Sequence, residues 1–298
     1  EAAATCDGFE AFRALALSKS PGAWAADADV AAEALELLAS TLCDRPCNIQ
    51  VGWGMGRRTN GSSIVRALDA LGALTGNLGI PGGGVSFYFK RRGAFDTSFL
   101  SKAWPRTLSE PLLGQEILKA KEPPVRAVWV TAANPVAMLP DSATVARALE
   151  TRELVVVVDS FLTDTARRAH LVLPTTTLVE DDDLMGAYGN HWLGASVPVV
   201  APPPGVRSDL EIAQLLAAEI DRRTGAGADG IAPRVAGSAK EWKRRLLRRV
   251  EPLGLTVERL ERESVRNPLA GNLLFEGGRF PTPSGKMSLL TALPAPPP

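Results

Sequence analysis

The residues of this sequence best suited to chemistry follow short hydrophobic runs. The first run, Cys47 to Val51, leads into Gly52-Trp53-Gly54-Met55-Gly56, and then into Arg57, Arg58 and Asn60-Gly61. Glycines let a backbone approach a ligand closely, arginines bind phosphate, and the start of a following helix favours anions. The spacing matches neither GxGxxG nor GxxxxGK[ST], so an ordinary turn remains the alternative.

Two later hydrophobic runs also end in polar residues. Arg126 to Thr131 is followed by Asn134-Pro135, whose side-chain amide both donates and accepts hydrogen bonds. Leu154 to Val158 is followed by Asp159 and Thr163, and an acidic residue at a strand tip commonly binds ribose hydroxyls. A turn-forming Asn and an N-capping Asp are the simpler alternatives. If all three strand tips share one sheet edge, they are equipped for a large nucleotide-like cofactor.

The elements that must position these residues alternate between strand and helix. Periodicity predicts two helices over residues 7–42, a helix from Ile64 to Leu74, strands over 126–131, 154–158 and 170–173, helices over 142–150 and 208–222, a linker over 225–238, and a basic amphipathic helix over 240–251. The β-branched strands are typical of a parallel sheet covered on both faces. We therefore expect an α/β fold with Rossmann-like parallel sheets and flanking helices.

Composition excludes several classes of protein. Of the 298 residues, 45% are hydrophobic and 22% charged, which is typical of a globular chain. Lys and Arg total 33, as do Asp and Glu, so no net field favours nucleic acid or an anionic membrane. No apolar run approaches the roughly 20 residues of a membrane helix. Three cysteines suit a reducing compartment, which favours a cytoplasmic over a periplasmic location.

Longer stretches of the sequence resemble one known family. Gly52 to Gly61, followed by Arg66 to Gly84, is similar to the pterin-facing stretch of molybdopterin oxidoreductases of the dimethyl sulfoxide reductase and formate dehydrogenase type. Further motifs follow in the order which that family uses: Asn134-Pro135, Val158 to Ala166, His170 to Pro174 and Arg207-Ser208-Asp209. Phe280 to Lys286 resembles the start of its C-terminal β-barrel domain.

The resemblance implies a cofactor and an activity. The cofactor is bis-molybdopterin guanine dinucleotide, which holds molybdenum or tungsten through dithiolene sulfurs and carries the redox chemistry. By position, the resemblance places Gly54, Met55, Gly56, Arg58 and Asn60 at the pterin, and Asn134, Asp159 and Thr163 at the guanosine and its phosphates. The implied reaction is the two-electron oxidation or reduction of a small molecule such as formate, nitrate or a sulfur oxyanion, with an electron-transfer subunit as a possible partner.

The resemblance also suggests that the chain is the central fragment of a catalytic subunit. Members of the family carry a metal-ligating Cys, selenocysteine or Ser farther upstream, and often a cysteine cluster for an iron–sulfur centre. We interpret Cys6, Cys43 and Cys47 as structural or incidental, so no residue here is assigned to catalysis or to the metal. The isolated fragment is expected to be inactive. The expected domains are a partial α/β domain with the pterin-facing segment (1–100), a Rossmann-like guanosine-binding domain (101–230), and a linker, basic helix and barrel start (231–298).

Other interpretations stay open. A domain like that of thiamine diphosphate enzymes also holds a diphosphate at strand tips, and a non-catalytic binding module would use the sheet only as a scaffold. The run Glu180 to Asp183 is interpreted as a solvated loop rather than a divalent-cation site, because adjacent carboxylates point apart. His191 is interpreted as structural, a proton-handling role for His170 is doubted, and the basic helix is expected to keep a solvated basic side.

Overall fold

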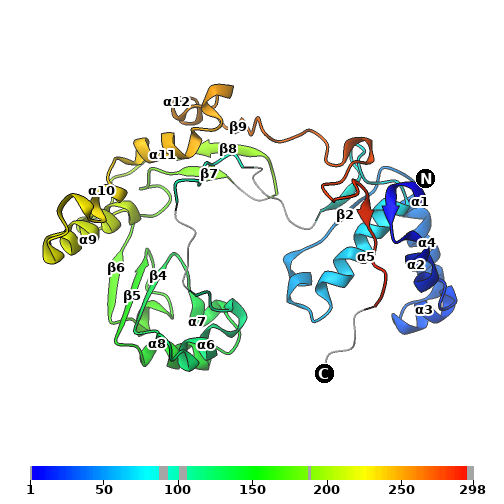
Figure 1. Cartoon of the computed structure of the whole chain (residues 1–298), viewed down its shortest axis with the longest axis horizontal. Helices are drawn as coiled ribbons and strands as arrows, with labels where there is room; N and C mark the ends of the chain where they lie inside the picture. The colour runs from blue at the N-terminus through cyan, green and yellow to red at the C-terminus, as the bar shows by residue number, and fades with distance from the viewer. Residues whose placement is uncertain (1, 87–92, 101–105, 187–188, 294–298) are drawn as a thin grey trace. The chain divides into compact units, whose positions relative to one another are not determined.

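A computed structural model describes residues 2–86, 93–100, 106–186 and 189–293. The chain forms two compact units (Figure 1). Unit 1 comprises residues 1–92, 187–191 and 269–298, and unit 2 comprises residues 93–186 and 192–268. Helices and short, mostly parallel strands make up both units, which agrees with the predicted α/β class.

Unit 1 begins with more helices than the sequence predicts. The helices are α1 (Ala2–Thr5), α2 (Phe9–Ala16), α3 (Pro21–Asp27) and α4 (Ala32–Cys43). The expected pair of helices over 7–42 is wrong only in its second member, which is divided into α3 and α4. α3 is separate from α2 because the Ser20 side chain accepts a hydrogen bond from the Ala23 N–H and Pro21 occupies the first helical position. Asp29, with a φ of 55°, then turns the chain toward α4.

Two parallel strand pairs organise the rest of unit 1. β2 (Asn48–Gln50) pairs with β3 (Gly84–Ser86), so the Gly-rich stretch from Gly79 onward ends in a strand. Between them lie the 3₁₀ helix η1 (Trp53–Arg57) and α5 (Gly61–Leu74). β1 (Cys6–Asp7) pairs with β10 (Met287–Ser288), close to the 3₁₀ helix η6 (Glu276–Gly278). The predicted continuation from this region into a β-barrel stays a prediction.

The core of unit 1 joins its two ends. Cys6 and Ala70 are buried with Met287 and Leu289, and Phe280 packs against them. Arg66 on α5 supports the same junction, because its guanidinium donates to the Leu289 carbonyl over 2.9 Å. Segments from both ends of the chain therefore hold α5 in place.

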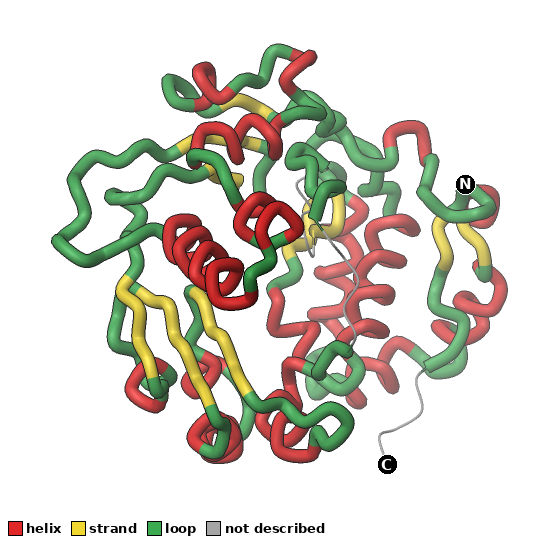
Figure 2. The backbone as a smooth tube through the Cα atoms, turned by 60° about the vertical axis from the view of Figure 1, so that its left-hand side comes forward, coloured by secondary structure: helices red, strands yellow, loops and turns green. Residues whose placement is uncertain are grey.

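The central sheet of unit 2 is parallel, in the order β4 (Ala127–Thr131), β5 (Leu154–Asp159) and β6 (Leu171–Pro174) (Figure 2). Its strands match the predicted runs within about one residue at each end. Two helices, α7 (Pro135–Met138) and α8 (Ser142–Glu150), cover one face. Val130, Val155 and Val157 on that face form a core with Val145 and Leu149 of α8.

The opposite face of this sheet is less covered than predicted. Trp129, Leu154 and Leu171 are 45%, 44% and 47% exposed, although Val156 and Val158 between them are buried. Among the described residues, helices cover the sheet chiefly from the side of α7 and α8. The prediction of burial on both faces is therefore correct for Val155 to Val158 of the central strand, but not for Leu154 at its start or for the edge-strand residues Trp129 and Leu171.

The remainder of unit 2 contains elements that the sequence did not suggest. η2 (Glu110–Leu112) leads into α6 (Leu113–Lys119), and η3 (Ala166–Arg168) follows β5. An antiparallel sheet contains β7 (Leu184–Gly186), β8 (Trp192–Ala195) and β9 (Val265–Arg266). Leu193 of β8 lies in a core with Leu247 and Val250. This sheet therefore supports the basic helix.

The last helices of unit 2 are α9 (Asp209–Thr224), α10 (Ala232–Val235), α11 (Ala239–Leu247) and α12 (Val257–Leu260), with η4 (Gly227–Asp229) and η5 (Glu251–Leu253) between them. The predicted linker over 225–238 is therefore wrong in its centre. This segment forms short helices because the Asp221 carboxylate accepts hydrogen bonds from the N–H groups of Ile231 and Ala232, at 2.9 and 2.8 Å. Among the described helices, none is both long and apolar enough to span a bilayer.

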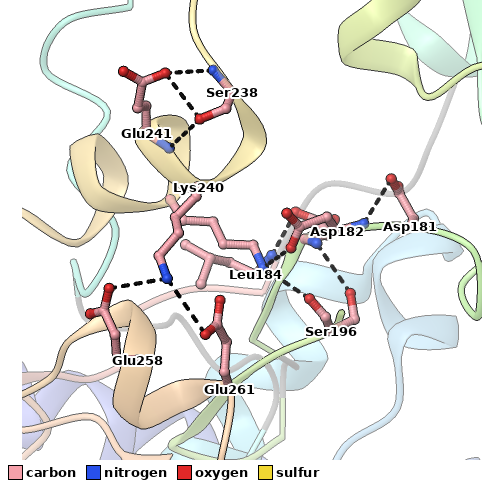
Figure 3. A network of polar contacts seen from close by, with 11 residues as sticks. Asp181, Asp182, Leu184, Ser196, Ser238, Lys240, Glu241, Glu258 and Glu261 are labelled. Atoms are coloured by element: carbon pink, nitrogen blue, oxygen red, sulfur yellow. Dashed lines mark hydrogen bonds and ion pairs between the residues drawn. The ribbon is translucent and has the colours of Figure 1, made fainter. Parts of the chain in front are cut away.

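The basic side of α11 is exposed, as expected, except at Lys243. Lys240 contacts Glu258 of α12 at 3.2 Å and Glu261, which follows α12, at 3.8 Å (Figure 3). Lys243 is 3% exposed and pairs with Asp182. The helix therefore keeps a solvated basic side and also forms ion pairs with neighbouring segments of unit 2.

Candidate cofactor-binding site

The Gly-rich segment of unit 1 forms a tight junction with α5. Gly54, Met55 and Gly56 lie in η1, Arg58 follows it directly, and Asn60 is the N-cap residue of α5. A Cβ at Gly61 would lie 1.7 Å from the Met55 carbonyl oxygen. A Cβ at Gly54, by contrast, would meet no heavy atom within 4 Å. Glycine is thus sterically required at Gly61, whereas the backbone at Gly54 is open to a ligand.

Positive groups gather at this junction. The N-terminus of α5 carries the positive end of the helix dipole, and the Asn60 side chain makes no capping hydrogen bond. Arg57 and Arg58 are exposed and form no ion pair with any residue in the described part of the chain. Such a combination of backbone donors and guanidinium groups suits an anionic ligand.

A cavity of about 790 Å³ lies farther along the same glycine-rich region, within unit 1. Residues Gly79 to Gly84 line one part of it and Gly271 to Glu276 another, and Asn48 and His191 also contribute. Gly79 has a φ of +77°, and a Cβ there would lie 2.5 Å from the Phe275 carbonyl oxygen. Here glycine allows two backbone segments to approach and shape the wall of the cavity.

In unit 2, Asn134 lies in the loop after β4 and is bound through its side-chain carbonyl. The oxygen Oδ1 accepts from the N–H of Thr165 at 3.1 Å and from the Thr165 hydroxyl at 2.7 Å. Both hydrogen bonds reach across to the loop after β5. The sequence predicted Asn134 as a ligand-binding residue, and the structure adds that its carbonyl joins two strand-end loops.

Asp159 and Thr163 lie in the loop after β5. The Asp159 carboxylate accepts from the Phe161 N–H at 2.9 Å through one oxygen, Oδ1. The Thr163 hydroxyl oxygen accepts from the Ala166 N–H at 3.1 Å. Within the described residues, the second Asp159 oxygen has no hydrogen-bond partner, and the Thr163 hydroxyl donates to none. Each side chain therefore orders its own loop and retains one polar group for a ligand.

The structure brings the predicted residues together in two groups. Gly54, Met55, Gly56, Arg58 and Asn60 are neighbours in unit 1, whereas Asn134, Asp159 and Thr163 lie at the carboxyl ends of β4 and β5 in unit 2. The two strand ends are adjacent, because Thr131 is paired with Val158 in the register of the sheet. Sequence reasoning missed Thr165, which is fully buried between the loops.

The acidic run Glu180 to Asp183 is tied into unit 2 rather than solvated. Glu180 accepts from both the N–H and the hydroxyl of Thr177, at 2.8 and 2.9 Å. Asp182 pairs with the buried Lys243. Burial raises the pKa of Asp181, opposed by a hydrogen bond from the Asp182 N–H and reinforced by the charge of Asp183. In the described ranges, no group of three His, Cys, Asp or Glu side chains is arranged to hold a metal ion.

His170 and the three cysteines lie outside these two groups. The His170 ring nitrogen Nδ1 accepts from the Val155 N–H at 3.0 Å, so this side chain helps to hold β5 and β6 together. Cys6 is a buried member of the unit 1 core, whereas Cys43 is an exposed free thiol and Cys47 a half-buried one. His170 and Cys6 therefore have structural roles.

Each unit has polar groups that suit a ligand. Amide and hydroxyl donors in unit 2 suit phosphate oxygens and a carboxylate suits ribose hydroxyls, whereas the glycine–arginine junction of unit 1 suits an anion. In α/β proteins, the carboxyl edge of a parallel sheet is the usual place for a ligand.

Comparison with known proteins identifies the family to which the chain belongs. The family model described as molybdopterin oxidoreductase matches residues 19–219, which is more than half of the chain. The chain belongs to the molybdopterin oxidoreductase family, as its motifs suggest.

Two curated relatives illustrate the range of the family. A probable oxidoreductase of Bacillus subtilis, YyaE, is 30% identical over 292 residues, covering 96% of this chain and 42% of its own length. A biotin sulfoxide reductase of Cereibacter sphaeroides is 28% identical over 210 residues, covering 63% of this chain and 28% of its own length. The chain therefore spans less than half the length of these relatives.

A solved structure shares the fold. Acetylene hydratase from Pelobacter acetylenicus superposes with a TM-score of 0.73 at 19% identity, over 97% of this chain and 44% of the hydratase chain. At this identity the likeness establishes the fold alone. Because the neighbour is named a hydratase, whereas the two relatives are named an oxidoreductase and a reductase, the fold does not by itself determine the reaction.

Proposed function

We propose that this chain binds a molybdopterin guanine dinucleotide cofactor within a larger oxidoreductase subunit. Asn134, Asp159 and Thr163 would hold the guanosine and its phosphates. The segment containing Gly54, Met55, Gly56, Arg58 and Asn60 would line the pterin. The bis form of the cofactor, with molybdenum or tungsten, is part of the proposal.

The observation that carries this proposal is the polarity of the strand ends in unit 2. Asn134 retains amide donors, Thr163 retains a hydroxyl donor, and Asp159 retains a carboxylate acceptor. The donors of Asn134 and Thr163 are suited to phosphate oxygens, and the carboxylate of Asp159 is suited to ribose hydroxyls. The same three positions are the ones which the resemblance assigns to the guanosine part of the cofactor.

The proposed activity of the intact subunit is the two-electron oxidation or reduction of a small molecule. Formate, nitrate and sulfur oxyanions are the proposed substrate types, and the names of the relatives add sulfoxides and N-oxides. When bound, the metal–dithiolene group supplies the electron-transfer chemistry. The residues of this chain bind and orient that group and neutralise its phosphates.

The first test measures nucleotide binding by the chain itself. Guanosine diphosphate should raise the thermal midpoint of the 298-residue chain, because a ligand that binds only the native form stabilises it. Asp159→Asn should weaken this response by removing the acceptor charge. Asp164→Asn is the matched control, since Asp164 is an exposed carboxylate of the same loop.

A second test uses the protein encoded by the full-length gene, expressed in a host that synthesises the cofactor. Molybdenum or tungsten and acid-released guanine nucleotide should co-purify with it, and both should fall in the Asp159→Asn variant. Absence of metal and nucleotide in the unmodified protein, together with no response of the chain to guanosine diphosphate, would rule out the assignment.

A further inference from the structure

Thr165 is the point at which the two strand-end loops of unit 2 meet. Its side chain is fully buried, with an exposure of 0%. It follows β5 by six residues, yet it contacts Asn134 and Val136 in the loop and helix that follow β4. A buried threonine with partners on a different loop restrains both segments.

The direction of each hydrogen bond at Thr165 follows from chemistry. The Val136 N–H can only donate, so it donates to the Thr165 oxygen Oγ1 at 3.1 Å. The Thr165 backbone N–H donates to Asn134, and the accepting atom must therefore be the carbonyl oxygen Oδ1. The Thr165 hydroxyl proton is directed to the same oxygen over 2.7 Å. Two donors thus occupy both lone pairs of Oδ1.

This arrangement determines what Asn134 offers to a ligand. With its oxygen occupied, the side chain retains only its NH₂ group, and no described residue accepts a hydrogen bond from that group. The amide is therefore oriented as a pure donor. A ligand at this position must supply an acceptor, such as a phosphate oxygen, because a second donor would be left unpaired.

We propose that Thr165 is a positioning residue that fixes the orientation of the Asn134 amide and thereby selects a phosphate oxygen at the edge of unit 2. The proposal rests on the proposed nucleotide-binding function. It adds that the Asn134 amide recognises the phosphate of the ligand and not only its nucleoside. Thr165 acts through Asn134 and needs no contact with the ligand.

Asn134→Asp tests this polarity directly. The variant keeps an oxygen that accepts both hydrogen bonds from Thr165, but it replaces the NH₂ group by an oxygen. We expect a loss of guanosine diphosphate affinity of at least about tenfold, measured by calorimetry on the full 298-residue chain. Binding of guanosine, which lacks phosphate, should change less than about twofold.

Thr165 itself is tested by a conservative pair of variants. Thr165→Val removes the hydroxyl and should weaken guanosine diphosphate binding about tenfold, whereas Thr165→Ser keeps the hydroxyl and should restore it to within about twofold. In an Asn134→Ala background, Thr165→Val should cause no further loss, because the two residues act as one unit. If Thr165→Val does not fold, Asn134→Asp still tests the proposal, because unchanged guanosine diphosphate affinity in that variant would overturn it.

The outcomes separate two failures. If the unmodified chain binds guanosine diphosphate and Asn134→Asp binds it equally well, the polarity proposal is overturned and the nucleotide-binding function stands. If Thr165→Val lowers thermal stability but leaves affinity unchanged, Thr165 is merely structural and the proposal is again wrong. If the unmodified chain binds neither guanosine diphosphate nor guanosine, the proposed function fails and this inference fails with it.

Discussion

Lys243 on α11 forms an ion pair with Asp182 in the loop before β7, and its ammonium group also donates to the Ser196 carbonyl at 2.9 Å. The lysine side chain is 3% exposed, whereas that of Asp182 is 34% exposed. A buried cation thus joins a helix to the antiparallel sheet. The acidic run before β7 is held in place by this lysine.

The first prediction concerns that ion pair. Lys243→Met should lower the free energy of unfolding by about 2 to 3 kcal/mol, because it leaves a partly buried carboxylate without its partner. Lys240→Met is the matched control on the same helix. Its 40% exposed ion pair with Glu258 should contribute no more than about 0.5 kcal/mol. Urea denaturation measures both, and equal effects would contradict the assigned role of Lys243.

The second prediction concerns Asp96. Hydrogen bonds from the Ser98 side chain and N–H, and then from Arg248, lower the pKa of Asp96 to about 2 from its usual 3.8. A lowered folded-state pKa stabilises the protein above the unfolded value, and the stabilisation is lost as the pH falls through the folded value. Wild type should therefore be more stable than Asp96→Asn above about pH 4, with the difference vanishing toward about pH 2.

Denaturation curves collected between pH 6 and pH 3 would measure the Asp96 effect. Arg248→Gln provides a graded comparison, because it removes the guanidinium but leaves the Ser98 hydrogen bonds, which lower the pKa of Asp96 more strongly. Its loss of stability should be smaller than that of Asp96→Asn. A difference between wild type and Asp96→Asn that grows on acidification would show the sign to be wrong.

The third prediction concerns the glycines of the candidate site. Gly61→Ala should destabilise the chain by about 1 to 3 kcal/mol, because its Cβ would lie 1.7 Å from the Met55 carbonyl oxygen and displace η1. Gly54→Ala should leave stability within about 0.5 kcal/mol, because its Cβ meets no heavy atom within 4 Å. Thermal melting of the two variants measures this contrast, and a reversed order would be incompatible with the packing of η1.

The fourth prediction concerns Asn77, which is 1% exposed. Its carbonyl oxygen accepts from the Cys47 N–H at 2.8 Å, and its amide donates to the Leu42 carbonyl at 2.7 Å. Asn77→Ala should cost about 3 kcal/mol, because both backbone groups lose their partner.

Asn48→Ala serves as the control for Asn77. Asn48 is exposed and makes a longer hydrogen bond to the Gly83 carbonyl, at 3.3 Å, so its loss should cost less than about 1 kcal/mol. If Asn77→Ala has only a small effect on stability, the two hydrogen bonds of Asn77 are not important for folding, and the prediction is wrong.

Local signals explain what could be predicted from the sequence. The valines of β5 predict a central strand, and Ser208 with Glu211 predicts the start of α9, where both hydrogen bonds of the capping box are present. The molybdopterin family follows from its ordered motifs. In each case the determining residues are close in sequence or match a known pattern.

The missed features depend on distant partners. β7, β8 and β9 are short and of mixed composition, and β8 pairs with β9 only because Val265 is brought beside Leu193. Thr165 shows the same limit for the candidate site. Its burial depends on the loop after β4, and no pattern around Thr165 indicates that contact. The assigned ligand contacts of Gly54, Asn134 and Asp159 stay predictions.

The pairing of β1 with β10 has a consequence for synthesis of the chain. Cys6 emerges from the ribosome long before Met287, its partner in the register. This pair must therefore wait until Met287 has been translated, when all segments of unit 2 are already complete. A product that stops near Gly285 would leave β1 without its partner strand, and the segment around β1 should then be sensitive to proteases.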